Sequence, residues 1–277
     1  MFHKGHKIED LILEILSNGS VDTKTLIEKI KLVRLNTSKQ AVYKILKVLK
    51  ENEIIIQNRE EIAISSVWLK KLVDFVEKSR LSYKTENNLD INFVNLKQGE
   101  KVSYSFKNFE IADMFWAHVF DILLDITPFS FPIFIYNPHE WPLLARTQSE
   151  TYLLNRLQNI SKKLFLLVGN RTQLDIDVGK YFDGEVTNYF ASNETVFPKS
   201  NYYVNVFDDF LIEVWLDPKI SADLDLFYKE NKVLDENSKN KILEIIKQKG
   251  RNKLVITRNK RKADTIRRVF SKFFVIK

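Results

Sequence analysis

The chain has 277 residues, enough for two domains of ordinary size, and its hydrophobic content of 44%, with 20 Phe, is typical of a folded globular protein. It contains no cysteine, which excludes disulfides, thiolate metal sites and thiol nucleophiles. No apolar run is long enough for a signal peptide or a membrane span, so we expect a cytoplasmic protein without a membrane partner.

The net charge of +7 is distributed unevenly along the chain. Residues 1–80 carry 15 Lys and Arg against 11 Asp and Glu, residues 81–238 carry 14 against 23, and residues 239–277 carry 14 against 2. The two ends are therefore basic and the middle is acidic. This pattern favours a polyanion that contacts one or both ends, or a basic carboxy-terminal segment that packs on the acidic middle.

Apolar residues recur at helical spacing in three short segments of the first 50 residues. The first segment spans 8–17, the second begins at Asp22 or Thr23, either of which can cap it, and the third follows a polar break near 34–37. The third helix repeats the apolar pattern at Val42, Ile45, Leu46 and Leu49. Three short helices with a tight break before the last predict a helix-turn-helix.

Two apolar runs, 54–56 and 62–64, flank a polar turn at 57–60 and predict a two-stranded hairpin. Three helices followed by a hairpin is the order of elements in a winged helix. Residues 40–55 resemble the recognition helix and first wing strand of bacterial and archaeal winged-helix regulators. The resemblance implies that residues 1–65 form a winged helix-turn-helix domain that binds double-stranded DNA.

Burial of the apolar face of the third helix would leave its polar side chains on the surface. A recognition helix lies in the major groove with its first turns against base edges, and Gln40 has the carboxamide that can pair with adenine. Arg59 is the one basic residue of the predicted wing turn and precedes two glutamates, so we expect the wing to bind DNA phosphate weakly. A lysine-rich face that is merely solvated, or that contacts protein, is the alternative. The candidate DNA-binding residues are Thr37, Ser38, Lys39, Gln40, Tyr43, Lys44, Lys47 and Arg59.

Residues 66–80 predict a fourth helix. One face of it carries Trp68, Leu72, Phe75, Val76 and Ser79. Such a helix either pairs with the same helix of a second copy in a homodimer or packs on the first helix of its own chain. Because the stretch 83–99 is the most linker-like part of the chain, we assign 66–99 to a linker helix and a linker.

Residues 100–277 alternate between helix and strand patterns. The predicted strands are 133–136, 163–168, 202–207, 210–216 and 253–257, and the predicted helices are 109–124, 148–159, a segment after 169–172, 219–229, 238–249 and 260–273. Asp208-Asp209 predicts a hairpin turn between two of these strands. Strands separated by helices indicate an α/β layered domain with a largely parallel sheet. We expect this domain to serve as an effector or dimerisation domain.

Residues 201–209 with 211–214, and further along 253–257 with 263–274, resemble the carboxy-terminal effector half of TrmB-like regulators, which is related to phospholipase D. The resemblance implies a domain that binds a small molecule, commonly a sugar, and biases DNA affinity. Phospholipase-D-type catalysis needs a His with a Lys two residues on, and neither His118 nor His139 has one. We find no other catalytic motif, no metal site and no cofactor motif, and therefore expect no enzyme.

Two loops are candidates for ligand binding. The loop after the strand at 133–136 is dense in polar and aromatic groups, and open α/β sheets bind ligands at the carboxyl ends of their strands. The turn at 169–172 can hold an anion at a helix amino terminus, although capping by Asn170 or Thr172 explains it equally well. The candidate ligand-binding residues are His139, Glu140, Arg146, Asn170 and Arg171.

The sequence therefore predicts a dimeric DNA-binding transcriptional regulator whose second domain senses a ligand, dimerises or recruits a partner protein. One alternative is a metal-dependent DNA nuclease that uses Asp208 or Asp209, Glu213 and the Asp217-Pro218-Lys219 segment. The other is an antitoxin or defence-system protein that represses its own operon. The sequence does not determine the DNA site, the effector, the sign of regulation, the pathway or whether the basic last helix contacts nucleic acid.

Overall fold

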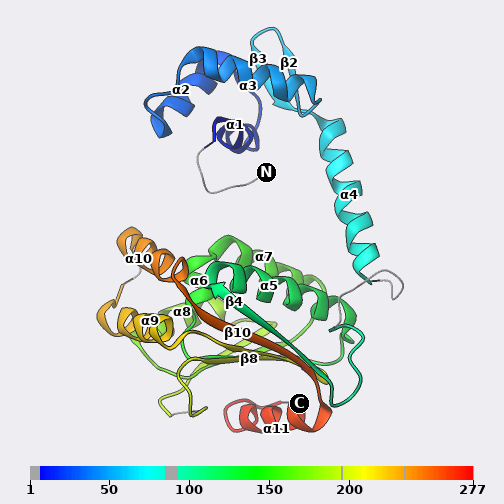
Figure 1. The fold of residues 1–277 in the computed structure, drawn as a ribbon, viewed down its shortest axis with the longest axis vertical. Coiled ribbons are helices and arrows are strands. Elements are labelled where there is room, and N and C mark those ends of the chain that lie inside the picture. The colour runs from blue at the N-terminus through cyan, green and yellow to red at the C-terminus, as the bar shows by residue number, and fades with distance from the viewer. Residues whose placement is uncertain (1–6, 85–92, 195, 234, 277) are drawn as a thin grey trace. The chain divides into compact units, whose positions relative to one another are not determined.

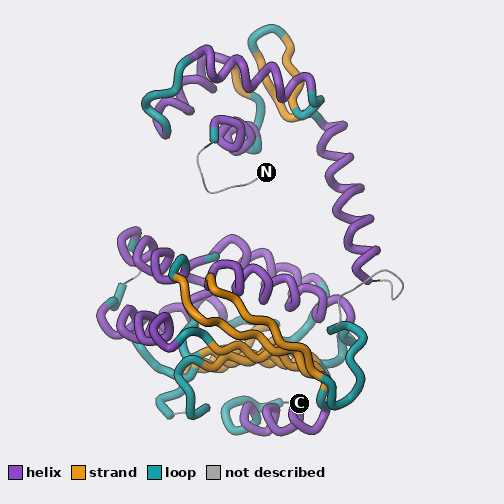
Figure 2. Tube along the Cα trace, in the orientation of Figure 1, coloured by secondary structure: helices purple, strands orange, loops and turns teal. Residues whose placement is uncertain are grey.

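The computed structural model of the chain describes residues 7–84, 93–194, 196–233 and 235–276, without the side chains of 80–84 and 236. The chain divides into two compact units, Met1–Thr85 and Glu86–Lys277. Figure 1 labels the elements of both units and Figure 2 colours them by type. Each unit has its own apolar core, so the two are described separately.

The first unit has short helices, a small sheet and one longer helix. Its elements are α1 (Ile8–Leu16), β1 (Val21–Asp22), α2 (Thr23–Val33), α3 (Lys39–Glu51), β2 (Ile55–Asn58), β3 (Glu61–Ile64) and α4 (Ser66–Lys84). The predicted helices and the predicted hairpin are confirmed. The sheet has the order β1-β3-β2, and the two-residue β1, too short to give a sequence pattern, pairs antiparallel with β3.

The apolar faces of α1, α2 and α3 meet in the core of the first unit. Residues with no exposed surface there include Ile12, Leu26, Ile30, Val42, Leu49 and Ile62. Each such side chain contributes roughly 1.5–3 kcal/mol by leaving water. Two N-caps fix where the helices begin: Asp22 accepts a hydrogen bond from the Thr25 amide, and Ser38 accepts one from the Ala41 amide. Burial of one face of α3 leaves the other face to solvent.

The second unit is built on a seven-stranded sheet of order β4-β10-β9-β8-β5-β6-β7. Its strands are β4 (Lys101–Asn108), β5 (Ile133–Asn137), β6 (Leu164–Val168), β7 (Thr187–Ala191), β8 (Tyr202–Phe207), β9 (Phe210–Trp215) and β10 (Lys249–Arg258). Its helices are α5 (Phe109–Ile126), α6 (Trp141–Ala145), α7 (Thr147–Asn159), α8 (Gln173–Phe182), α9 (Pro218–Glu230), α10 (Glu236–Ile246) and α11 (Lys260–Phe270).

The sheet is mixed, so the expectation of a largely parallel sheet was wrong. Only the β5–β6 and β6–β7 pairings are parallel, while the other four strand pairings are antiparallel. One reason is the predicted hairpin at Asp208-Asp209, which reverses the chain between β8 and β9; Asp208 takes the left-handed backbone conformation there, with φ 49°. Another is that β10, although it follows two helices, returns antiparallel beside β9.

Strands β4 and β7 lie at the two edges of the sheet and were not predicted. Exposed and half-buried residues alternate along β4, so it lacks the continuous apolar run that marks the central strands. The range predicted as a linker also contributes to the fold, because Phe93 and Leu96 are buried in the core of the second unit. The rest of that linker, 85–92, lies outside the described residues.

Both faces of the sheet are covered (Figures 1 and 2). Helices α5 to α10 contribute to the apolar cluster on one face, and α11 is the helix that contributes to the cluster on the other among the described residues. Successive strand residues alternate between these faces: Ile133 belongs to the first cluster, and Phe134 to the second. No helix in the described ranges is long and apolar enough to cross a membrane.

Candidate functional site

The exposed face of α3 is the candidate nucleic-acid interface. Lys39, Gln40 and Lys44 are exposed, and Tyr43 keeps 53% of its surface accessible. The first turn of α3 contains no acidic residue. Within the described part of the chain, neither Lys39 nor Lys44 takes part in an ion pair, whereas Lys47 lies 3.8 Å from Glu51. Within the described residues of the first unit, the charges of the first two turns of α3 therefore have no opposite charge paired with them.

Three of the predicted DNA-binding residues have structural positions that change their expected role. Thr37 is buried, with 6% of its surface exposed, so it is not part of the exposed face of α3. It precedes the N-cap, a position that commonly packs back against the first turn. Ser38 is exposed, but its hydroxyl serves as the N-cap of α3. Arg59 lies at the exposed β2–β3 turn with φ 54°, beside Glu60 and Glu61.

A cavity of about 730 Å³ in the second unit is the candidate ligand site. It lies between α5, α7 and the face of the sheet formed by β5, β6 and β8. This volume is within the range of about 300 to 1,000 Å³ that small-molecule sites occupy. Its walls combine apolar side chains such as Trp116, Phe120, Leu153, Leu166 and Phe182 with the polar side chains of Asp113, Asn137, Glu140, Arg146, Glu150 and Asn205.

Arg146 is clamped at the cavity wall by two carboxylates. Its Nη1 lies 2.9 Å from Oδ1 of Asp113, and its Nη2 lies 2.9 Å from Oε1 of Glu150. The guanidinium also lies over the ring of Trp141, with 5.5 Å between its central carbon and the ring centroid. Burial raises the pKa of Glu150 although Arg146 opposes the rise. The ion pairs fix the start of α7 against α5.

Glu140 and Asn137 lie side by side in the cavity wall. Asn137 Nδ2 donates a hydrogen bond of 2.7 Å to Oε2 of Glu140. Burial, reinforced by the Glu150 carboxylate, raises the pKa of Glu140 to about 8. Asn137 is 3% exposed, and its Oδ1 accepts no hydrogen bond from any described residue. Asn137 Oδ1, a buried acceptor without a donor among the described residues, thus lies in the same part of the wall as the Glu140 carboxyl, whose charge is poorly compensated.

His139 does not line the cavity, although it was predicted as a ligand-binding residue. Its Nδ1 lies 2.9 Å from Oδ2 of Asp175, its Nε2 lies 3.4 Å from Oδ1 of Asp225, and its ring stacks on Tyr228. Burial acts to lower the pKa of His139, but hydrogen bonds and charge from the two aspartates outweigh it and leave the pKa raised. The imidazole therefore ties the β5–α6 loop to α8 and α9.

At the start of α8 the structure shows the capping that the sequence offered as the alternative to an anion site. Thr172 and Asp175 form a capping box there, so a protein carboxylate already occupies the amino terminus of the helix. Asn170 donates a hydrogen bond of 3.1 Å to the carbonyl of Pro138, and Arg171 is exposed outside the cavity. Of the five predicted ligand-binding residues, the structure brings Glu140 and Arg146 into the cavity.

Sequence reasoning missed the other polar residues of the cavity. Asp113 falls on the buried face of α5, which also carries Ala112 and Trp116. Asn205 interrupts the otherwise apolar and aromatic strand β8, and Trp116 Nε1 donates a hydrogen bond to it. A polar residue inside an apolar pattern was the available signal, because a buried polar group needs a partner.

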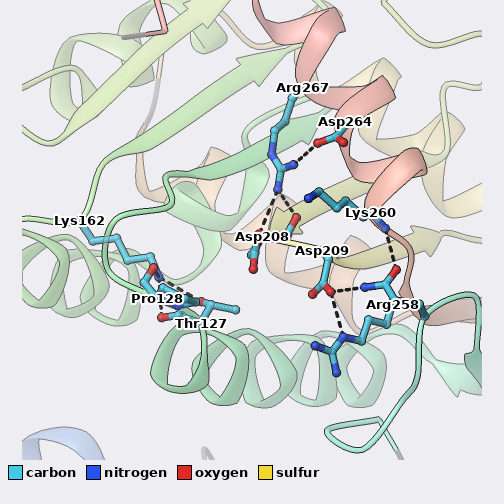
Figure 3. A network of polar contacts seen from close by, with 10 residues as sticks. Thr127, Pro128, Lys162, Asp208, Asp209, Arg258, Lys260, Asp264 and Arg267 are labelled. Carbon is cyan, nitrogen blue, oxygen red and sulfur yellow. Dashed lines mark hydrogen bonds and ion pairs between the residues drawn. The ribbon is translucent and has the colours of Figure 1, made fainter.

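The acidic residues considered for a nuclease have separate structural partners. Figure 3 shows Asp209 beside Arg258 and Asp208 beside Arg267. Gln98 also donates a hydrogen bond to Asp209. Glu213 bonds to Tyr202 and to Lys262 of α11, and Asp217 is the N-cap of α9. In the part of the chain that the structure describes, no three His, Asp or Glu side chains are grouped to hold a metal ion.

A buried lysine completes the network in Figure 3. Lys162 is 1% exposed, and its ammonium donates hydrogen bonds to the carbonyls of Thr127 and Pro128 and to the Thr127 hydroxyl. Burial lowers the pKa of Lys162 to about 8. With its three donors directed at these oxygens, the side chain fixes the turn after α5.

No protein-family model matches the sequence, and no protein with a curated description matches it. Among solved structures, the chain is similar to that of TrmBL2, described as an archaeal chromatin protein that shows a novel mode of DNA binding. The match covers 96% of this chain and 91% of that one, with 9% sequence identity and a TM-score of 0.34. That score is too low to establish a shared fold, and so the resemblance to TrmB-like regulators stays an expectation from the sequence.

Proposed function

We propose that the chain is a DNA-binding regulator whose first unit is a winged helix that places α3 in the major groove of duplex DNA. The observation that carries the proposal is the uncompensated exposed face of α3, formed by Lys39, Gln40, Tyr43 and Lys44.

The chemistry of this face suits DNA. The two lysines suit phosphate oxygens, and Gln40 suits the N6 and N7 edge of adenine. The positive end of the α3 dipole lies in the same first turn, which favours an anion. The wing is acidic around Arg59, so one copy of the unit would hold phosphate weakly. Two copies would give the affinity that one lacks.

We propose that α4 supplies the dimer contact. Leu69, Val73 and Val76, at i, i+4 and i+7, form an exposed apolar stripe with 45%, 60% and 49% of their surface accessible. A second copy of α4 would cover this stripe. The double variant Val73→Glu/Val76→Glu should shift the chain to a monomer in sedimentation equilibrium. Lys78→Glu, which makes the same change in net charge elsewhere on α4, should not.

We also propose that the second unit is an effector domain that binds a small molecule in its cavity. The cavity has a suitable volume, and its polar groups come from helices and strands that a ligand would hold together. A ligand that binds one arrangement of the unit more tightly than another would bias DNA binding.

The test of DNA binding is capture of random genomic fragments by the purified chain, in Mg²⁺ and in chelator, followed by sequencing. We expect enrichment of intact fragments that share an inverted repeat, because a symmetric dimer selects a symmetric site. Cleavage confined to the Mg²⁺ sample would favour the nuclease alternative. No enrichment would leave the first unit as a protein-contact domain.

A matched pair of variants then locates the interface. Lys39→Ala/Lys44→Ala removes two lysines from each copy of the dimer, so it should weaken binding to the enriched site and lower the slope of log affinity against log salt by roughly 4, since each phosphate contact contributes about 0.9. The control Lys229→Ala/Lys232→Ala removes two exposed lysines of the second unit and should leave the slope unchanged. Equal slopes for the two double variants would refute the assignment to α3.

A further inference from the structure

The charges around the cavity indicate what kind of ligand it accepts, an inference that rests on the proposed effector role of the second unit. Three carboxyl groups, those of Asp113, Glu140 and Glu150, face one guanidinium, that of Arg146. Both terminal nitrogens of Arg146 are engaged by Asp113 and Glu150. Asp121 and His118 also line the cavity, and Asp121 is paired with Arg156 at 3.0 Å. The wall is therefore short of positive charge near Glu140.

A second observation points to a ligand at the same place. Asn137 lines the cavity, is 3% exposed, and has an Oδ1 that accepts no hydrogen bond within the described structure. A buried acceptor in this state costs about 1–3 kcal/mol unless something donates to it. Its own Nδ2 holds the Glu140 carboxyl at 2.7 Å, so the two acceptors lie together. A group that donates several hydrogen bonds and carries positive charge satisfies both.

The remaining walls are apolar. Trp116 and Phe120 come from α5, Leu153 and Leu154 from α7, and Phe182 from α8. Such walls favour a hydrocarbon or aromatic body because its burial removes apolar surface from water. The cavity thus combines a polar end that accepts hydrogen bonds with an apolar interior.

We propose that this cavity binds a small organic cation, a primary amine attached to an apolar group. The ammonium donates hydrogen bonds to Asn137 Oδ1 and to Glu140, whose carboxyl releases its proton to solvent when the cation binds beside it, and the apolar group packs against Trp116 and Phe120. A neutral alcohol of the same shape donates to the Asn137 acceptor but brings no positive charge to the carboxyl groups of this wall. A carboxylate of the same shape meets repulsion from Glu140 and Glu150.

Three probes of one shape test the proposal: 2-phenylethylamine, 2-phenylethanol and phenylacetate. Each is titrated at neutral pH into the full chain without DNA, and binding is measured by ligand-observed NMR. We expect the amine to bind at least tenfold more tightly than the other two. Failure of the amine to bind, or equal or tighter binding of the alcohol or the carboxylate, overturns the proposal.

Two variants locate the binding. Glu140→Gln keeps the shape and the bond from Asn137 but carries no charge, and should lower amine affinity at least tenfold. Ala117→Trp, at an exposed position of the cavity lining, should obstruct entry and abolish binding, and it decides the question if Glu140→Gln fails to fold. Glu244→Gln removes an exposed carboxylate of α10 and should change nothing. Amine affinity retained in either cavity variant overturns the assigned location.

The measurement separates this inference from the proposed regulation. Because the titration contains no DNA, a protein that fails to enrich genomic fragments can still bind the amine. A protein that enriches an inverted repeat but does not bind the amine retains the proposed DNA-binding function and loses only the ligand class.

Discussion

The two units use charged residues in opposite ways. In the first unit, Lys39 and Lys44 are exposed and have no ion pair within the described chain. In the second unit, Arg146 and His139 are held by carboxylates that are largely buried, and Lys262 of the basic α11 lies 2.6 Å from Glu213. A count of basic residues therefore does not identify a nucleic-acid surface. What matters is whether the protein already supplies the opposite charge.

The largest expected effect on stability comes from a buried ion pair of the second unit. His139→Phe keeps a ring against Tyr228 but removes the cation between Asp175 and Asp225. Loss of one partner of a buried pair costs about 3–5 kcal/mol, so the free energy of unfolding of the second unit should fall by that order. Chemical denaturation in a Trp68→Phe background measures it, because the other three tryptophans belong to the second unit.

The pH dependence of this effect has a definite sign. Because the pKa of His139 is raised on folding, its stabilising contribution is complete below the unfolded pKa of about 6.5 and is lost as pH rises through the folded value. The difference between wild type and His139→Phe should therefore shrink with rising pH. Lys71→Ala, which breaks the exposed pair with Glu53, should leave stability unchanged; an effect as large as that of His139→Phe would contradict the comparison.

Glu140→Gln should give the next largest effect on the free energy of unfolding. At high pH this variant should stabilise the second unit, whereas His139→Phe destabilises it. The carboxyl binds its proton more tightly in the folded chain, with a pKa of about 8 against 4.5, so folding becomes less favourable as pH rises between these values. Glutamine remains neutral, and the variant should be more stable than wild type at pH 9 by several kcal/mol, since each pKa unit of the shift is worth about 1.4 kcal/mol. Unfolding curves at pH 5 and pH 9 check this. Parallel pH profiles of the two proteins would show that Glu140 is not held protonated.

Because the polar residues on the face of α3 are exposed, changing one of them should alter DNA binding and leave the stability of the first unit unchanged. Gln40→Ala should weaken binding to the selected DNA site by about 1–3 kcal/mol and relax base preference at one position. Its unfolding curve should match that of wild type because the side chain is exposed. Gln158→Ala on the exposed face of α7 serves as the control. A stability change without a binding change would place Gln40 in the fold rather than at an interface.

The smallest effect separates the two possible roles of Ser38. Ser38→Ala should destabilise the first unit by about 1 kcal/mol, and Ser38→Gly by only a few tenths, because the hydroxyl caps α3 and glycine is a tolerated N-cap. Hydrogen exchange of the α3 amides measures this. If Ser38→Gly, with its cap nearly intact, loses as much DNA affinity as Ser38→Ala, Ser38 also contacts DNA.

Local sequence was sufficient for the helices and the hairpin of the first unit because the apolar residues of α3, such as Val42, Leu46 and Leu49, recur at the helical period and are all buried. It was also sufficient to expect exposure of Gln40 and Lys44, which lie off this apolar face. It was insufficient for Thr37, whose burial depends on how the chain enters the helix.

The sequence by itself determined which segments are helix or strand in most of the chain, because periodicity and turn residues are local. The tertiary structure decided the direction of the strands, since antiparallel β10 is chosen by its neighbours β9 and β4 and not by its own residues. It also decided the cavity: Asp113, Asn137 and Glu150 come from α5, β5 and α7, and only packing brings their side chains to one wall. Contacts between residues distant in sequence leave no local pattern, so this chemistry could not be predicted from the sequence.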